Sequence, residues 1–373
     1  MKRTPATYLN HCSMGLPTAR VQQALAEYLR EWTTLGAGGW DEVWLDRLAE
    51  WRKLTARLVG CRSDEIAWLP SVGAGLGSLA SALAAQAGPG GRLEGRDDVV
   101  LADLEFPAAL AAFSPNRNLR VRTARSVDGL GVEPERYAAK LGERSRAVIA
   151  SRVFYGTGAV QDVAAIAAAA RRAGAFSILD DYHGTGQIPL DVKALGVDAA
   201  VGGSLKWLRG GIGSAWMYVD RRRIRGLEPA HSGWWANQGM LAFTGRFRYW
   251  DDARRFECGE VNLPSLATAT EATRELLELG PARVGRRIQS LRRDLVERLV
   301  DAGHVVREHA NPARRSGIIM VPRADAAADV TRLARRGVTV DARGPALRVS
   351  PHHDTESADL ERFVQALGKP RPA

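Results

Sequence analysis

The sequence predicts an α/β protein, with a doubly wound, mostly parallel sheet in a large domain and a smaller α+β domain after it. Short apolar runs alternate with helical patterns over 66–220, which is typical of strands joined by crossover helices. Residues 265–301 have the pattern of one long helix, and strands are predicted near 317–321, 338–340 and 346–349. We expect three parts: an N-terminal segment at 1–45 that packs with the small domain, a large domain at 46–264 and a small domain at 265–373.

Composition and charge exclude several classes of protein. A chain of 373 residues that is 45% apolar can bury a sizeable core. No apolar run approaches the ~20 residues of a membrane span, and residues 1–10 lack the apolar core of a secretory signal. The net charge of +10 comes almost wholly from arginines spread along the chain, so we expect no nucleic-acid partner. Three distant cysteines indicate a reducing cytoplasm, buried thiols and no metal site.

One stretch, at 176–213, places a carboxylate and an amine at the ends of two predicted strands. An apolar run ends on Asp180, His183 follows, and Lys206 comes after a second apolar run at 199–201. Because open α/β sheets bind ligands at the carboxyl edge of their strands, Asp180 and Lys206 can face each other across a crevice there. A Schiff-base lysine opposite a carboxylate that holds a pyridinium nitrogen is what pyridoxal phosphate requires.

Other strand ends add candidates around this pair. A strand at 66–69 leads through Val72 and Gly73 into a helix, and this arrangement aims backbone N–H groups at a phosphate. Phe106 follows a strand at 99–102; it can stack on a cofactor ring or simply pack at the strand end. Trp40 lies on a glycine-rich loop and is a substrate-contact candidate, whereas Trp44 and its neighbours at helical spacing are expected in the core.

With these residues in place, the chain resembles pyridoxal-phosphate enzymes of fold type I, in the class V aminotransferase group, and within that group kynureninases. The resemblance runs from Tyr8 to Leu367. It rests on several short motifs in order: Tyr155-Gly156-Thr157-Gly158, Lys206-Trp207-Leu208-Arg209-Gly210-Gly211, Ser232-Gly233-Trp234-Trp235, Phe256-Glu257-Cys258-Gly259 and Leu347-Arg348-Val349-Ser350-Pro351.

The resemblance implies a role for each matched residue. Lys206 would bind the cofactor and move protons at the substrate's α and β carbons, and Asp180 would keep the pyridine nitrogen protonated. His183 and Tyr155 would lie beside the cofactor, with Tyr155 also near the substrate. Arg348 would hold the α-carboxylate of an amino acid. The further cofactor contacts would be Val72, Gly73, Phe106, Ser151, Ser204 and Trp234, and the further substrate contacts Glu260 and Trp40.

Several positions depart from the kynureninase pattern. Leu205 stands where that family has tyrosine, Ala109 where it has aspartate, and Glu260 where it has asparagine or threonine. A glutamate opposes the negative charge that develops on the carbonyl oxygen when kynurenine is cleaved, and it would suit a substrate with a cation or hydrogen-bond donors. Arg246 and Arg248 nearby could neutralise Glu260, which leaves kynurenine open.

We therefore predict a pyridoxal-phosphate enzyme that cleaves an L-amino acid at the β or γ position of its side chain, as a kynureninase-like C–C hydrolase or a C–S β-lyase, on a specialised-metabolite substrate. The alternative is transamination or another transformation, such as decarboxylation-linked chemistry. A silent binding protein on this fold is disfavoured because Lys206, Asp180 and Arg348 are all present. The family implies a homodimer, and we expect it in the cytoplasm.

Overall fold

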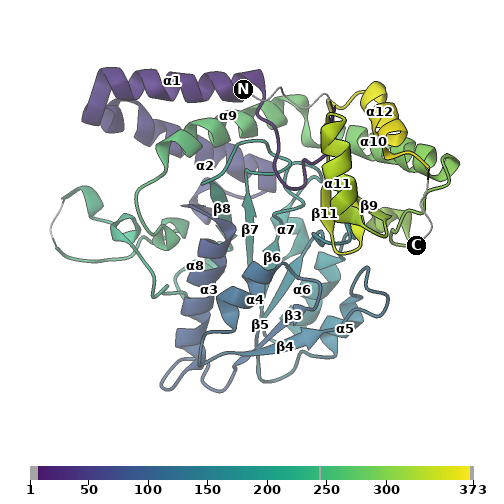
Figure 1. Cartoon of the computed structure of the whole chain (residues 1–373). Helices are drawn as coiled ribbons and strands as arrows, with labels where there is room; N and C mark the ends of the chain where they lie inside the picture. The colour runs from purple at the N-terminus through teal and green to yellow at the C-terminus, as the bar shows by residue number, and fades with distance from the viewer. Residues whose placement is uncertain (1–6, 243–244, 370–373) are drawn as a thin grey trace.

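The computed structural model describes residues 7–242 and 245–369, and its centre is a seven-stranded sheet (Figure 1). The strands lie in the order β2-β8-β7-β6-β5-β3-β4. β8 runs antiparallel to β2 and β7, and the other neighbouring pairs are parallel. The predicted doubly wound, mostly parallel sheet is therefore confirmed. Its strands are β2 (Ile66–Leu69), β3 (Asp98–Ala102), β4 (Arg120–Ala124), β5 (Ser145–Ser151), β6 (Phe176–Asp180), β7 (Ala199–Gly203) and β8 (Ala215–Val219).

The central strands are apolar because helices cover both faces of the sheet. Every residue of β5, β6 and β7 is buried, which is the pattern of a parallel sheet covered on two sides. In the register of these strands Ser151 lies beside Asp180, and Asp180 beside Val201. The polar residues that end β5 and β6 therefore meet at one edge.

Short helices connect these strands. One core lies between the sheet and α3 and α4, and another lies between the sheet and α5 and α6. The bounds are α3 (Val72–Ala87), α4 (Pro107–Phe113), α5 (Pro134–Ala138), α6 (Val163–Arg172), α7 (Val192–Leu195) and α8 (Arg221–Ile224).

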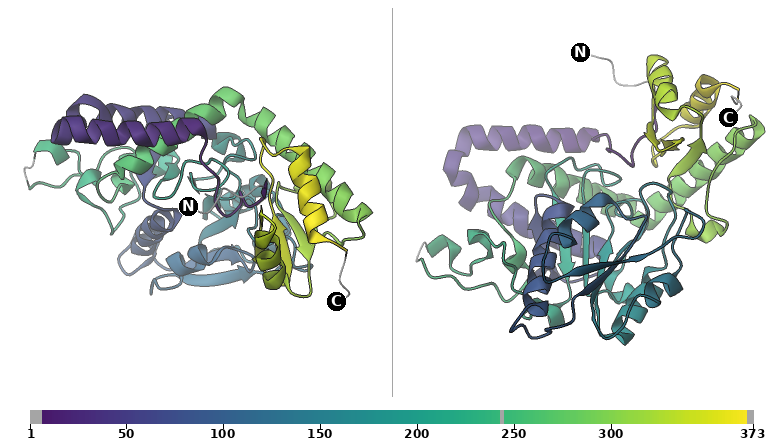
Figure 2. Two further views of the ribbon diagram at one scale, coloured as in Figure 1. Left: turned by 45° about the horizontal axis from the view of Figure 1, so that its top comes forward. Right: turned by 60° about the horizontal axis from the view of Figure 1, so that its bottom comes forward.

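A smaller α+β unit stands beside the large sheet (Figure 2). Its three-stranded antiparallel sheet has the order β11-β12-β9, and β1 pairs in parallel with β10. Strands were expected near the positions of β9, β10 and β12, and they lie there. The bounds are β1 (Thr7–Tyr8), β9 (Ile319–Pro322), β10 (Val338–Thr339), β11 (Asp341–Arg343), β12 (Ala346–Val349), α11 (Ala326–Arg335) and α12 (Ser357–Leu367).

The single long helix predicted at 265–301 is wrong. Two helices, α9 (Leu263–Leu279) and α10 (Pro281–Asp301), are separated at Gly280, whose φ is +81°. Glycine tolerates this φ, and the following proline begins the second helix, so Gly280 and Pro281 stop one helix and start another. α10 then buries Ile288, Leu295 and neighbours at helical spacing.

The N-terminal helices lie over the top of the large domain in Figure 1. α1 (Ala19–Leu35) and α2 (Leu45–Val59) both pack on α9. Trp44 and Trp51 are buried in the core, as expected. Cys12 is buried, but Cys61 and Cys258 are only half-buried, so the expectation of three buried thiols is wrong for those two.

The expected division at 45 and 264 stays a prediction, and its outermost residues, 1–6 and 370–373, lie outside the described ones. None of the helices in the described part of the chain has both the length and the apolar composition that crossing a membrane requires.

Candidate active site

A cavity of about 120 Å³ lies at the carboxyl edge of β5, β6 and β7. It brings together most of the residues singled out from the sequence, which come from five separate segments of the chain. The predicted residues that line it are Val72, Gly73, Phe106, Ser151, Tyr155, Asp180, His183 and Lys206.

Lys206 is buried in this cavity. Its Nζ hydrogen-bonds to Nε2 of His183 and lies 4.3 Å from the centre of the Tyr182 ring. The close approach of that ring depends on Gly203, because a Cβ there would come within 2.3 Å of Tyr182. Burial lowers the pKa of Lys206 well below that of a free lysine, although the charges of Cys12 and Asp180 oppose the shift. The amine is therefore easier to deprotonate than a surface lysine.

Burial shifts the pKa values of Asp180 and His183 in opposite directions. Burial raises the pKa of Asp180, while the Tyr182 N–H, which donates to Oδ1 at 2.9 Å, and the charge of Lys206 act against the rise. Burial and the charge of Lys206 lower the pKa of His183 well below its usual value. His183 is therefore neutral, and its buried Nδ1 has no partner among the described residues. A ligand with polar edges would satisfy both side chains.

The opposite wall of the cavity is the first turn of α3. Ser71 caps this helix, with its side chain accepting from the Ala74 N–H at 3.1 Å. The N–H groups of Val72 and Gly73, at the start of the helix, have no partner inside it. Because such groups and the helix dipole attract anions, this wall suits a phosphate. Phe106, whose ring lies 5.1 Å from that of Tyr155, forms the adjacent side.

Glu105 is a buried carboxyl group that was not anticipated from the sequence. Its oxygens accept from the Ser151 N–H at 3.1 and 3.2 Å, from the Ser151 hydroxyl, and from the Tyr137 hydroxyl at 3.5 Å. Burial raises the pKa of Glu105 to about 8. The only sequence signal was its position between a strand and Phe106. Glu105 fixes the orientation of Ser151 at the cavity wall.

Arg348, on β12, is only 1% exposed. It donates to the Tyr155 carbonyl at 2.8 Å, to the Ser13 hydroxyl at 2.6 Å and to Asp341 Oδ2 at 2.7 Å. Its Nε is buried without a partner among the described residues. Arg343 also pairs with Asp341, at 2.9 Å. Two guanidinium groups therefore share one carboxylate, so a second anion would complete the balance.

Besides Arg348, four predicted residues do not line this cavity. The Ser204 hydroxyl donates to the carbonyls of Gly211 and Ser214 at 3.1 and 3.2 Å. Trp234 donates to Glu260 at 3.1 Å, on an exposed segment. Trp40 packs in the core, its ring 5.5 Å from Trp44 and 5.7 Å from Trp235. Their predicted ligand contacts stay predictions.

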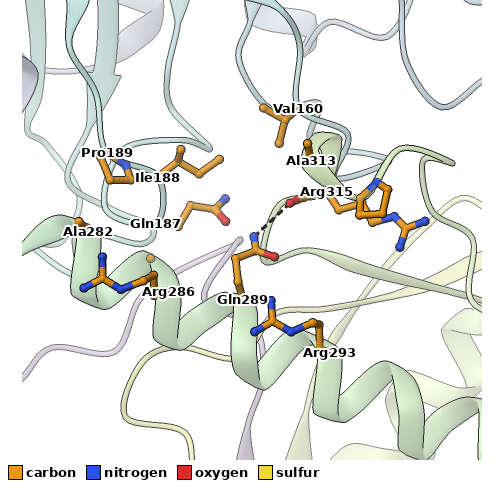
Figure 3. A pocket seen from close by; sticks show the side chains of 12 residues that line it. Val160, Gln187, Ile188, Pro189, Ala282, Arg286, Gln289, Arg293, Ala313 and Arg315 are labelled. Carbon is orange, nitrogen blue, oxygen red and sulfur yellow. Dashed lines mark hydrogen bonds between the residues drawn. The ribbon is translucent and has the colours of Figure 1, made fainter.

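A larger cavity of about 680 Å³ lies elsewhere, between α10 and the loops at 187–189 and 312–315 (Figure 3). Gln289 on α10 donates across it to the Arg315 carbonyl at 3.0 Å. Arg286 and Arg293 on its rim are exposed. It contains none of the residues that line the cavity around Lys206.

The buried amine, the carboxyl group at the end of β6 and the helix terminus surround one cavity at the carboxyl edge of a doubly wound sheet, as a pyridoxal-phosphate enzyme of fold type I requires. The donors and the orphaned Nδ1 of His183 fit that cofactor. The chain belongs to the aminotransferase class-V family, whose model matches residues 8–359.

Two proteins of similar sequence illustrate the range of the family. The chain is 28% identical over 361 residues to the uncharacterized aminotransferase YcbU of Bacillus subtilis (strain 168), over 97% of this chain and 93% of that protein. It is 27% identical over 365 residues to a kynureninase of Geobacillus thermodenitrificans (strain NG80-2), over 92% and 83% of the two chains.

Solved structures show the same fold at lower identity. The complex of the cystine C–S lyase C-DES with its product cysteine persulfide has a TM-score of 0.87 at 19% identity, over 99% of this chain and 100% of that one. The apo cysteine desulfurase from Thermococcus onnurineus NA1 has a TM-score of 0.85 at 17% identity, over 97% and 93%.

Proposed function

We propose that this chain is a pyridoxal-phosphate enzyme that cleaves an L-amino acid at the β or γ carbon of its side chain, either as a kynureninase-like C–C hydrolase or as a C–S β-lyase. The observation that supports this most is the buried Lys206 amine, held by His183 in the same cavity as Asp180. A family relationship to kynureninases over more than nine-tenths of the chain adds support.

Each residue near the cavity would have a separate task. Bound pyridoxal phosphate supplies an electron sink for the charge that develops at the substrate's α carbon. Lys206 would hold the cofactor and then take and return protons at the α and β carbons, which its lowered pKa favours. Asp180 would hold a proton on the pyridine nitrogen. Val72 and Gly73 would bind the phosphate, and Phe106, Ser151 and His183 would orient the ring.

Arg348 would receive the α-carboxylate of the substrate. Its unpaired Nε and its position beside the Tyr155 carbonyl support this role, because a guanidinium edge matches a carboxylate in plane and spacing. Asp341 and Ser13 would keep the guanidinium in position.

The remaining candidates would act across a homodimer. Trp234 and Glu260 are bonded to each other and both are exposed, so that a second copy could bring them to its own cavity. Ser204 would support the phosphate side indirectly, and Trp40 would position Trp235. We expect a cytoplasmic homodimer with a role in the biosynthesis of a specialised metabolite. Light scattering at micromolar concentration tests the dimer.

Transamination is the second candidate, and the similarity to a protein described as an aminotransferase favours it. Purified holoenzyme should be incubated with kynurenine and with cysteine conjugates, and assayed for anthranilate, alanine, pyruvate and thiol. Anthranilate with alanine indicates C–C cleavage, and pyruvate with thiol indicates C–S cleavage. A keto acid that accumulates together with pyridoxamine phosphate would indicate transamination and contradict the proposal.

Glu260→Asn tests the substrate side. If Glu260 selects against kynurenine, this variant should improve kynurenine turnover about tenfold or more, since it removes a charge that opposes the developing oxyanion. Glu228→Gln, at another exposed glutamate, is the matched control. Equal turnover in the two variants would remove Glu260 from the specificity argument.

A further inference from the structure

A second polar cavity, of about 130 Å³, lies at the amino edge of the central sheet. Its walls come from the first residues of β5 and β6, from α8 and from the segment after α3. β5 connects the two cavities, because its second residue, Arg146, lines this one and its last residue, Ser151, lines the other. The separation along the strand is about 17 Å.

Arg146 is the buried side chain of this cavity, with 4% exposed. Its Nη2 donates to the side-chain oxygen of Gln86, whose amide nitrogen in turn donates to the Gly226 carbonyl. Its Nε is buried without a partner. In the part of the chain that the structure describes, no carboxylate lies within ion-pair distance of this guanidinium. Among the described residues, its hydrogen bond is to a neutral amide, and the carboxylate whose charge reaches it, Asp198, is already paired with Arg223.

The charge on Arg146 persists despite its burial. Burial, with the nearby positive charges of Arg96 and Arg223, lowers the pKa of Arg146 to about 10, although the charge of Asp198 opposes the shift. At neutral pH the group is therefore still protonated. A buried cation that lacks a counter-ion is costly, and proteins usually pair such a group or bind an anion there.

The other arginines around the cavity increase the imbalance. Arg223 Nε lies 2.7 Å from Asp198 Oδ1, and Arg222 Nη2 lies 2.9 Å from Asp220 Oδ2, so each already has a carboxylate. Arg92 lines the same cavity. Its Nη2 would lie 3.3 Å from a Cβ added at Gly226, and it has no ion-pair partner among the described residues. Two of the four lining arginines, the buried Arg146 and the exposed Arg92, therefore have no ion pair among the described residues.

We propose that this cavity binds a tetrahedral oxyanion, the phosphate group of inorganic phosphate or of a small phosphate monoester, between Arg146 and Arg92. Guanidinium groups offer planar pairs of N–H donors that match phosphate oxygens, and one phosphate can accept from two arginines at once. Arg146 and Arg92 both line this cavity, and the Nε of Arg146 is buried without a partner among the described residues. This site is separate from the cofactor's own phosphate, which belongs to the first turn of α3 at the other edge of the sheet.

The test uses holoenzyme whose cofactor has been fixed to Lys206 by borohydride reduction, so that added phosphate cannot replace it. Thermal unfolding is followed at increasing inorganic phosphate, with chloride keeping the ionic strength constant. We expect a saturable rise in Tm, of about 2 °C or more at ten times Kd. A parallel titration with phenyl phosphate distinguishes free phosphate from a monoester as the preferred source.

Two variants locate the site. Arg146→Met should abolish the saturable response, and Arg92→Gln, at an exposed position that is safe for folding, should weaken Kd about tenfold. Arg144→Gln, at an exposed arginine paired with Asp97 near the same edge, should leave Kd unchanged. The proposal is overturned if phosphate and chloride give the same Tm curve, or if Arg92→Gln binds phosphate as tightly as the parent chain.

Discussion

The two edges of the central sheet differ in the groups that surround their buried cations. At the carboxyl edge, Lys206 lies with His183 and in the field of Asp180, and Arg348 has Asp341 as its counter-ion. At the amino edge, Arg146 is buried to a similar degree, but within the described part of the chain it bonds only to the amide of Gln86.

The chain supplies counter-charges where the cofactor and the amino acid would bind. Within the described residues it gives Arg146 no ion pair, and the nearby Asp198 is paired with Arg223, which is the physical reason for expecting an anion from solution there. Variants at each edge can test whether a cation with a counter-charge and a cation without an ion pair behave differently.

The largest expected effect is at the carboxyl edge. Lys206→Ala should abolish the visible absorbance of the bound cofactor and reduce turnover by about 10³-fold or more, because the amine is proposed as both the attachment point and the proton carrier. Absorbance spectra and a turnover assay check this. Lys193→Ala is the control, since Lys193 pairs with Glu65 outside the cavity. An unchanged spectrum in the Lys206 variant would contradict the assignment of the site.

Arg348→Lys should have the next largest effect. A lysine keeps the charge but loses the planar fork and the bond to the Tyr155 carbonyl. We expect KM for the amino acid to rise about 10- to 100-fold, with a smaller change in kcat. Steady-state kinetics measure both constants. Arg335→Lys, on the outer part of α11, should change neither; a KM unchanged in Arg348→Lys would show that the carboxylate binds elsewhere.

Glu105→Gln should alter the pH dependence of stability. The folded pKa of Glu105 is raised to about 8, so the folded state holds this proton between the ordinary glutamate pKa and pH 8 while the unfolded state has released it. Its stabilising contribution is therefore present at low pH and is lost as pH rises toward 8, by about 2–4 kcal/mol in the free energy of unfolding. Glutamine removes this loss.

Urea unfolding of both chains at pH 5, 6.5 and 8 measures the effect. The stability of the parent chain relative to Glu105→Gln should fall with rising pH. A difference that stays constant over this range would mean that Glu105 is already ionised at pH 5 in the folded protein.

The smallest expected effect is at the amino edge. Arg144 is 58% exposed in its pair with Asp97, and surface pairs of this kind contribute little. Arg144→Gln should change the free energy of unfolding by about 0.5 kcal/mol or less. A loss several times larger would show that arginines at this edge are structurally coupled, and would weaken the contrast between Arg144 and Arg146.

The sequence predicts best what depends on local pattern and strand ends. Strand and helix alternate with distinct periods, and the rule that parallel strands share a carboxyl edge is enough to place Asp180 near Lys206. The resemblance to kynureninases then gave Phe106 and Ser151, which line the same cavity.

Contacts between segments that are distant in the sequence could not be predicted from local pattern or strand ends. Glu105 bonds to Ser151, 46 positions away, and no periodicity marks a carboxyl group that will be buried. Arg146 reads as an ordinary charged residue beside a strand, since its lack of a partner depends on which side chains converge there. The break between α9 and α10 could have been predicted, because a glycine followed by a proline, Gly280-Pro281, is typical of a helix end. The continuous helical pattern on both sides of Gly280 led instead to the prediction of one helix.

The pairing of β1 with β10 has a consequence for how the protein is made. Thr7 aligns with Val338, and Ser13 bonds to Arg348. In each pair the first residue is synthesised more than 300 residues before the second. During translation the N-terminal segment has no partner to dock against, while the central sheet and Lys206 are already synthesised. The emerging chain therefore acquires Lys206 before the contact between Ser13 and Arg348 can form.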